Sequence, residues 1–259
     1  MPTATINGSR LRYRSQGERA NPTVVLSNSL GTDMNMWDEL AYRLARRFHV
    51  LRYDTRGHGG SASPAGPYSL ELLGSDVVKL LDMLDIERAH FIGLSMGGAI
   101  GQWLGIHAPR RLDKLVLANT AARIGTAEGW RSRAAAVRAG GMAQIADGSP
   151  GRWFTPGFIA AQPARVRTLQ DDVRHLEPEG YAACCDALAD ADLGADVKRI
   201  TAPTLVIAGT RDPVTTLFDA RVIQQAIAGS TLVGLPASHL SAVELPEPFA
   251  DAVEAFLLH

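Results

Sequence analysis

The chain has 259 residues, a formal net charge of −1 at pH 7 and 46% hydrophobic residues, with an isoelectric point of about 6.7. This length suits one large α/β domain, alone or with an insert, that buries a substantial core. The near-neutral charge argues against nucleic acid or an anionic membrane as a partner. No run approaches the ~20 apolar residues that a membrane-spanning helix needs.

The N-terminal third alternates predicted strands with predicted helices. An antiparallel hairpin is expected to turn at Asn7-Gly8, and residues 23–27 form a continuous apolar run, typical of a strand buried on both faces. A helix is expected over residues 34–47, followed by a strand over residues 50–53 and an amphipathic helix over residues 71–84. This alternation predicts a parallel sheet covered by helices on both faces.

Residues 93–97 read Gly-Leu-Ser-Met-Gly, between a predicted strand over residues 88–92 and a predicted helix over residues 98–107. A strand that enters a helix through one serine needs a tight turn with a strained serine backbone. The turn lifts the Ser95 hydroxyl clear of the sheet at the helix N-terminus, where a developing oxyanion is stabilised. The sequence therefore predicts a nucleophile elbow with Ser95 as the nucleophile.

After a predicted strand over residues 112–117 the alternation breaks. We interpret residues 121–194 as a helical cap inserted into a core domain of residues 1–120 and 195–259. Helix-like stretches of this region cover residues 130–139, 163–175 and 180–188. Its large apolar side chains either roof a pocket over Ser95 or form a small core of the cap itself. They are Trp130, Met142, Trp153, Phe154 and Phe158.

Two predicted strands near the C-terminus end in chemically active side chains. The buried run over residues 203–209 leads to Asp212, and the apolar run over residues 231–235 leads to His239. Taken alone, Asp212 is a turn or N-cap residue and His239 a surface-loop histidine. Both follow the carboxyl ends of strands, where such folds place catalytic groups, and the order Ser, Asp, His is that of a hydrolase triad. We therefore predict a catalytic triad of Ser95, Asp212 and His239.

Three motifs carry a resemblance to a known family. Residues 27–33 read Ser-Asn-Ser-Leu-Gly-Thr-Asp, residues 53–61 read Tyr-Asp-Thr-Arg-Gly-His-Gly-Gly-Ser, and residues 93–98 form the elbow. With these motifs the chain resembles the α/β-hydrolases, whose fold is a mostly parallel twisted sheet covered by helices. Residues 27–31, 119–133 and 148–154 narrow the resemblance, which covers nearly the whole chain, to the family of bacterial 3-oxoadipate enol-lactonases.

The resemblance implies a serine hydrolase that opens the lactone ring of 3-oxoadipate enol-lactone to 3-oxoadipate in the β-ketoadipate pathway of aromatic catabolism. Its partner would be a small carboxylated lactone, with no metal ion or other cofactor, no nucleic acid and no membrane. Recognition of a carboxylate calls for an arginine. Arg133 is our candidate, with Trp130 against the ring and Trp153 as a further contact, unless Arg133 is one more solvated arginine.

The oxyanion donors follow from position in the motifs. Many relatives have His-Gly where this chain has Asn28-Ser29, and because the donor is a backbone N–H the change need not impair catalysis. Position assigns the two donors to the N–H groups of Leu30 and Met96. We expect His58, in the second motif, to fix the loop beside this turn and not to act as a base.

Two other functions stay open at this point. A carboxylesterase or perhydrolase-like enzyme would use the same triad on neutral esters, and comparing the enol-lactone with a neutral aryl ester separates the two enzymes. A hydrolase-fold signal receptor would show little turnover on any substrate, with ligand-dependent partner binding. Adjacent Cys184 and Cys185 rarely form an unstrained disulfide, and no signal peptide is evident, so we expect a cytoplasmic protein.

Overall fold

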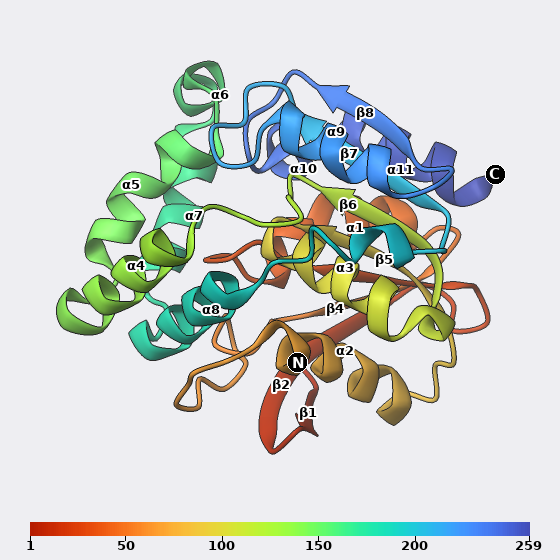
Figure 1. Cartoon of the computed structure of the whole chain (residues 1–259), viewed down its shortest axis with the longest axis horizontal. Helices are drawn as coiled ribbons and strands as arrows, with labels where there is room; N and C mark the ends of the chain where they lie inside the picture. Colours follow the sequence, from red (N-terminus) through yellow and green to blue (C-terminus); the bar gives the residue numbers. More distant parts are fainter.

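The computed structural model of the protein describes all 259 residues and is built around one eight-stranded sheet (Figure 1). The strands are β1 (Thr3–Ile6), β2 (Ser9–Gln16), β3 (Thr23–Ser27), β4 (His49–Tyr53), β5 (Ala89–Leu94), β6 (Leu112–Ala118), β7 (Thr204–Gly209) and β8 (Thr231–Leu235). Their order across the sheet is β1-β2-β4-β3-β5-β6-β7-β8. The pairs β1/β2 and β2/β4 are antiparallel, and the other neighbours are parallel. The predicted mostly parallel sheet is confirmed.

Helices cover both faces of this sheet. They are α1 (Asp38–Leu44), α2 (Leu70–Met83), α3 (Met96–His107), α9 (Leu217–Ala226), α10 (Ser241–Glu244) and α11 (Pro246–Leu258), with the 3₁₀ helices η1 (Met34–Trp37), η2 (Pro109–Arg111) and η3 (Val197–Arg199). α2 packs against α3, and α1 packs against α11. Figure 1 shows α3 in front of the sheet and α1 behind it. The buried runs in β3, β4, β5 and β7 are therefore covered from both sides.

Five further helices follow one another between β6 and β7. They are α4 (Ala127–Gly140), α5 (Ala143–Trp153), α6 (Pro156–Ala161), α7 (Pro163–Arg174) and α8 (Pro178–Asp190), and they gather at the left of Figure 1. α4, α7 and α8 confirm the three predicted helical stretches, whereas α5 and α6 have no counterpart in the prediction. Gly148, Pro150 and Gly151 disfavour a helix within α5. Ser149 Oγ donates to Ala146 O at 2.8 Å, the carbonyl that the missing N–H of Pro150 leaves free.

The prediction of one helix over residues 34–47 was wrong in its extent. Asp33 caps the 3₁₀ helix η1 by accepting a hydrogen bond from the Asn35 N–H. The α-helix then begins only at Asp38 and ends at Leu44. The capping aspartate fixes a tight first turn, which the apolar spacing of the sequence does not distinguish from an α-helical turn.

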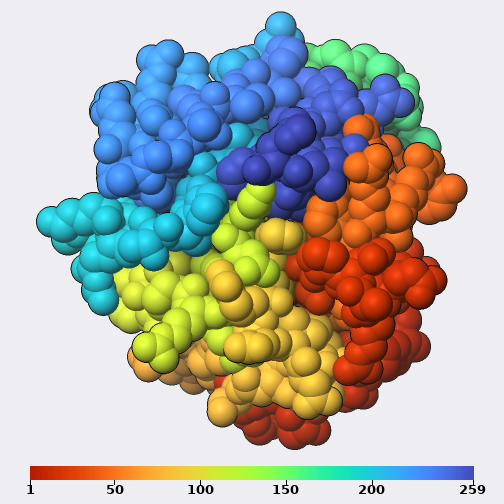
Figure 2. Space-filling view, turned by 90° about the vertical axis from the view of Figure 1, so that its right-hand side faces the viewer, coloured from red at the N-terminus to blue at the C-terminus, as the bar shows by residue number.

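The C-terminal helix α11 packs beside the first helix of the chain. The rings of Trp37 and Phe249 lie 6.1 Å apart, and Arg43 forms ion pairs with Asp251 and Glu254 at 2.6 Å each. Figure 2 shows α11 in dark blue against the orange segment that contains α1. None of the helices combines the length and the apolar character that crossing a bilayer requires.

The strand arrangement brings four loops together. β3, β5, β7 and β8 run parallel, so the segments that leave their carboxyl ends meet at one edge of the sheet. These segments carry Leu30, Ser95, Asp212 and His239.

Candidate active site

Ser95 occupies a strained turn between β5 and α3. Its backbone angles are φ 58° and ψ −113°, a conformation that L-residues rarely adopt. The Ser95 N–H donates to Ala118 O at 2.9 Å, which ties the turn to β6. The flanking glycines are required sterically, because a Cβ on Gly93 would lie 2.0 Å from Gly97 O and one on Gly97 2.2 Å from Ser27 O. The turn therefore has the geometry of the predicted elbow.

Two backbone N–H groups beside Ser95 have no acceptor within the protein. They belong to Leu30, in the loop after β3, and to Met96, the first residue of α3. The N–H groups of the residues that follow them are engaged: Gly31 N–H donates to His58 Nε2 at 2.9 Å, and Gly97 N–H donates to Asn28 O at 3.1 Å. The free pair is available to an oxyanion that forms on a substrate held by Ser95.

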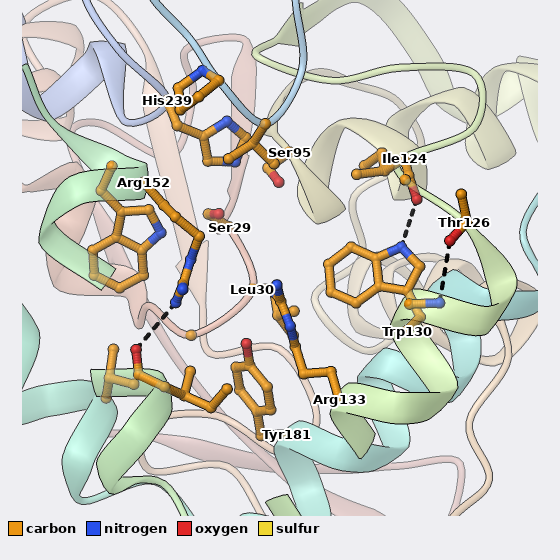
Figure 3. Close-up of a pocket in the computed structure, with 18 residues that line it drawn as sticks. Ser29, Leu30, Ser95, Ile124, Thr126, Trp130, Arg133, Arg152, Tyr181 and His239 are labelled. Atoms are coloured by element: carbon orange, nitrogen blue, oxygen red, sulfur yellow. Dashed lines mark hydrogen bonds between the residues drawn. The ribbon is translucent and has the colours of Figure 1, made fainter. Parts of the chain in front are cut away.

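Asp212 and His239 form a buried pair. His239 Nδ1 donates to Asp212 Oδ2 at 2.7 Å, with the two side chains 3% and 0% exposed. Burial raises the pKa of Asp212, but the hydrogen bond and the charge of His239, with further donors, outweigh burial and hold this pKa below its ordinary value. Asp212 therefore remains a carboxylate that orients the imidazole. Figure 3 shows His239 beside Ser95, with no hydrogen bond drawn between them. In unliganded hydrolases the hydrogen bond between nucleophile and base is often long and shortens only when substrate binds.

Asn119 is a residue that the sequence did not single out for this site. It follows β6 with a positive φ of 43°. Its Nδ2 donates to Asp212 Oδ2 at 3.0 Å and to Ser238 O at 3.1 Å. Asn119 thus holds the carboxylate and the segment before His239 at the same time. The feature of the sequence that could have identified Asn119 is its position directly after a predicted strand, where such folds place functional residues.

Glu244 is a second residue that the sequence analysis missed. This buried carboxylate accepts hydrogen bonds from the Ser238 N–H at 2.8 Å and from the hydroxyl and N–H groups of Thr155. The N–H of Leu240 donates to Trp153 O at 3.0 Å. The segment that carries His239 is therefore joined at two points to the connection between α5 and α6.

Ser95 and His239 line one cavity of about 300 Å³. Of the predicted site residues, Leu30, Ser95, Trp130, Arg133, Trp153 and His239 line it. Asp212 lies behind His239, and Met96 reaches the site only through its backbone. Of the other apolar side chains predicted for the roof, Met142, Phe154 and Phe158 do not line the cavity. The stacked rings of Phe154 and Phe158, 4.7 Å apart, instead pack within the α5–α6 region.

Arg133 and Trp130 form one unit on α4. The Trp130 indole N–H donates to Ile124 O, which fixes the ring. The guanidinium of Arg133 lies over this ring, 4.8 Å from its centroid. Figure 3 shows Arg133 pointing into the cavity, and no acidic side chain of the protein pairs with it. An arginine without a protein carboxylate in a partly apolar cavity is suited to binding an anion.

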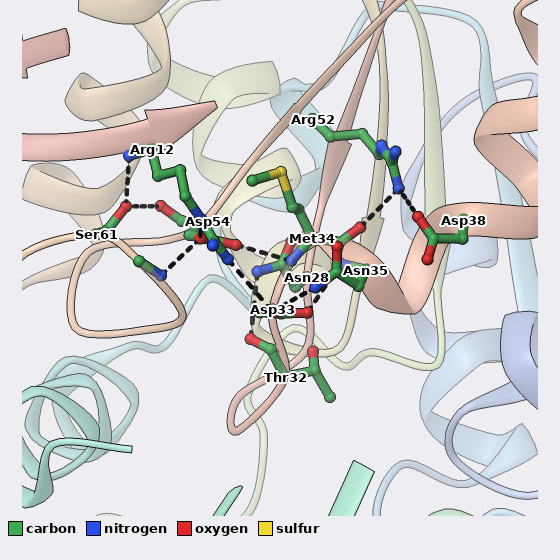
Figure 4. Close-up of polar contacts among 11 residues, drawn as sticks. Arg12, Asn28, Thr32, Asp33, Met34, Asn35, Asp38, Arg52, Asp54 and Ser61 are labelled. Carbon is green, nitrogen blue, oxygen red and sulfur yellow. Dashed lines mark hydrogen bonds and ion pairs between the residues drawn. The ribbon is translucent and has the colours of Figure 1, made fainter. Parts of the chain in front are cut away.

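A polar network supports the loop that carries Leu30 (Figure 4). Asp54, just after β4, accepts hydrogen bonds from the Met34 N–H at 2.9 Å and the Gly60 N–H at 2.8 Å, and forms an ion pair with Arg12. His58, four residues further on, accepts from the Gly31 N–H through Nε2. Both contacts attach the loop after β3 to the loop after β4, the structural role expected for His58.

Acid should destabilise the fold through His58. Burial lowers the pKa of His58 from 6.5 to about 4, and the Arg56 carbonyl and Asp54 only partly offset this shift. Because the unfolded chain takes up the proton first, stability falls as pH drops from 6.5 to about 4, by about 3 kcal/mol for this residue. Burial also lowers the pKa values of His49 and His90, in the same direction.

Urea unfolding between about pH 7 and about pH 4.5 measures this slope. His58→Gln should reduce the loss of stability in acid without abolishing it, since two other histidines contribute. His175→Gln, at an exposed position, is the matched control and should leave the slope as it is. Equal slopes in the wild type and His58→Gln would show that His58 is not the group responsible.

Comparisons with known proteins agree with this geometry. The alpha/beta hydrolase fold family matches residues 22–244. 3-Oxoadipate enol-lactonase 2 of Acinetobacter baylyi is 48% identical over 98% of this chain and 96% of its own. 3-Oxoadipate enol-lactonase 1 of the same organism is 40% identical over 96% of this chain and 94% of its own. The crystal structure of the enol-lactonase from Burkholderia xenovorans LB400 has a TM-score of 0.98, with 45% identity and 100% of both chains covered.

Proposed function

Because the chain belongs to the α/β-hydrolase family and, within it, to the 3-oxoadipate enol-lactonases, we propose that it hydrolyses 3-oxoadipate enol-lactone to 3-oxoadipate. One observation carries the proposal. The strained Ser95, the His239 that Asp212 orients, and an arginine without an acidic partner converge on a single cavity. This combination suits the hydrolysis of a small ester that bears a free carboxylate.

Acylation begins when His239 Nε2 takes the proton of Ser95 Oγ as that oxygen attacks the lactone carbonyl carbon. The N–H groups of Leu30 and Met96 donate to the oxyanion of the tetrahedral intermediate. Collapse of the intermediate breaks the bond between the carbonyl carbon and the ring oxygen. The departing oxygen, an enol that receives the proton from His239, stays attached to the acyl chain, so no alcohol leaves the cavity.

Deacylation repeats the same proton transfers with water. His239 deprotonates a water molecule that attacks the acyl carbon, and the proton then returns to Ser95 Oγ as the ester bond breaks. The enol tautomerises to the ketone, which gives 3-oxoadipate. Throughout, Asp212 remains ionised and stabilises the imidazolium form of His239. The helices of residues 121–194 would act as a cap that closes the cavity over Ser95.

Arg133 is the residue that we propose to meet the carboxylate, with Trp130 against the ring and Trp153 as a further contact. Arg133→Met should remove a charge-assisted hydrogen bond worth about 1.5–3 kcal/mol, which is about 10-fold to 150-fold in kcat/KM on the enol-lactone. Hydrolysis of a small neutral aryl ester should fall by less than about threefold, since the methionine keeps most of the stem. Arg133→Lys should recover part of the loss, because an ammonium lacks the planar fork.

Measuring kcat/KM on both substrates for the wild type and these two variants also tests the proposed function. A wild type that prefers the neutral ester would indicate a carboxylesterase, and one that turns over neither would indicate the receptor alternative. An equal fall on both substrates in Arg133→Met would mean that the change disturbs α4. We propose a cytoplasmic location as well, which the two free, buried thiols of Cys184 and Cys185 support.

A further inference from the structure

The cavity contains a second arginine that no motif indicates. Arg152 extends from α5 into the space lined by Ser95 and His239 (Figure 3). Its guanidinium lies where α5 has a glycine, since a Cβ on Gly148 would be 2.8 Å from Nη1. Nη2 donates to Ile145 O at 3.1 Å, and no carboxylate of the protein pairs with the charge. Arg152 therefore lines the cavity without a carboxylate partner.

Arg152 and Arg133 differ from the surface arginines of residues 121–194. Most of those have acidic partners, namely Arg123, Arg131, Arg138 and Arg174. Burial lowers the pKa of Arg152, and the positive charge of Arg133 lowers it further. Two cations thus line one cavity, and no carboxylate of the protein pairs with either of them. This arrangement disfavours the unliganded fold, so the arginines require a reason other than stability.

Tyr181, on α8, supplies a third donor at the same place. It is 3% exposed and lines the cavity, and Figure 3 shows its hydroxyl between the guanidinium groups of Arg133 and Arg152. No protein oxygen accepts a hydrogen bond from this hydroxyl. Burial raises the pKa of Tyr181 to about 12, so the phenol keeps its proton at neutral pH and acts as a donor.

We infer that Arg133, Arg152 and Tyr181 form one binding site for a carboxylate group, and that this site lowers the stability of the unliganded protein. The inference rests on the proposed function for the identity of the substrate, and it adds two residues to substrate recognition. A carboxylate accepts hydrogen bonds from two guanidinium forks and a phenol at once. Its negative charge adds an attraction to each arginine, and these attractions offset the repulsion between them. The site selects monoanionic lactones or esters whose carboxylate reaches α4, α5 and α8 while the carbonyl lies at Ser95.

The test compares Arg152→Met with Arg167→Met. Arg167 is an exposed arginine of α7 without an acidic partner, so it serves as the matched control. For each variant, adipate is measured as an inhibitor of neutral aryl ester hydrolysis, with neutral hexane-1,6-diol for comparison, and the thermal midpoint of the unliganded protein is determined. In Arg152→Met the inhibition constant of adipate should rise about 10-fold to 150-fold. The thermal midpoint should rise by about 2–4 °C.

A merely structural arginine would give the opposite sign in the thermal measurement. A lower midpoint in Arg152→Met, or unchanged inhibition by adipate, would overturn the inference, as would equal inhibition of the wild type by the diol. Tyr181→Phe gives an independent check and should weaken adipate inhibition by about 2-fold to 12-fold. These measurements do not require the protein to hydrolyse the enol-lactone. If the protein does not open the lactone but adipate inhibition still depends on Arg152, the proposed function is wrong and the carboxylate site is retained.

Discussion

Ser95→Ala should lower kcat by roughly 10³-fold to 10⁶-fold, on the enol-lactone and on a neutral ester alike. The substitution removes the nucleophile but leaves the cavity and the free N–H groups of Leu30 and Met96 in place. The fold should persist, because alanine at this position has the same backbone strain as serine. The steady-state rate and the thermal midpoint are measured for each protein. Ser29→Ala, which removes another hydroxyl from the same cavity, is the control and should stay within about threefold of the wild type.

Substitution of His239, the proposed partner of Ser95, tests the same proton transfer. His239→Ala should cost a similar factor, and the double variant should lose little more than the larger single loss, because the two groups act in one proton transfer. Losses that multiply in the double variant would argue against a shared step. A rate within tenfold of the wild type in Ser95→Ala would remove this serine from the mechanism.

The sequence predicted those parts of the site that depend on local pattern. The elbow needs glycine on both sides of one serine between a strand and a helix, and each requirement is visible within residues 88–107. Asp212 and His239 were identifiable because each follows an apolar strand, and parallel strands bring their carboxyl ends to one edge. The α/β-hydrolase family assignment is confirmed. The roles of the individual residues stay predictions that the variants test.

The parts that the sequence did not predict depend on contacts between distant segments. Asn119 contacts Asp212, 93 positions later, and Glu244 contacts Thr155, 89 positions earlier. In the sequence Arg152 resembles the other arginines of its region, and only the structure shows that it lines the cavity. Helix α5 escaped prediction because a serine hydroxyl compensates for the proline within it. Such features have no periodicity and only emerge when the chain is folded.

Asp212→Asn should lower kcat by about 10⁴-fold although the side chain keeps its size. Asp212 Oδ1 accepts from the N–H groups of Val214 and Thr215, whereas Oδ2 accepts from Asn119 Nδ2, the Thr215 hydroxyl and His239 Nδ1. The backbone donors cannot turn away, so the single oxygen of an asparagine must take the Oδ1 position. Its NH₂ group then faces His239.

An NH₂ group at that position can donate to His239 only if Nδ1 is unprotonated. The proton of His239 then moves to Nε2, where the imidazole can no longer accept the proton of Ser95, so the geometry survives while the base is lost. Rates and thermal midpoints are compared with those of Asn119→Ala, which removes one donor to Asp212 but keeps the carboxylate. Asn119→Ala should retain at least about tenfold more activity than Asp212→Asn. Activity of Asp212→Asn within tenfold of the wild type would mean that another group sets the tautomer of His239.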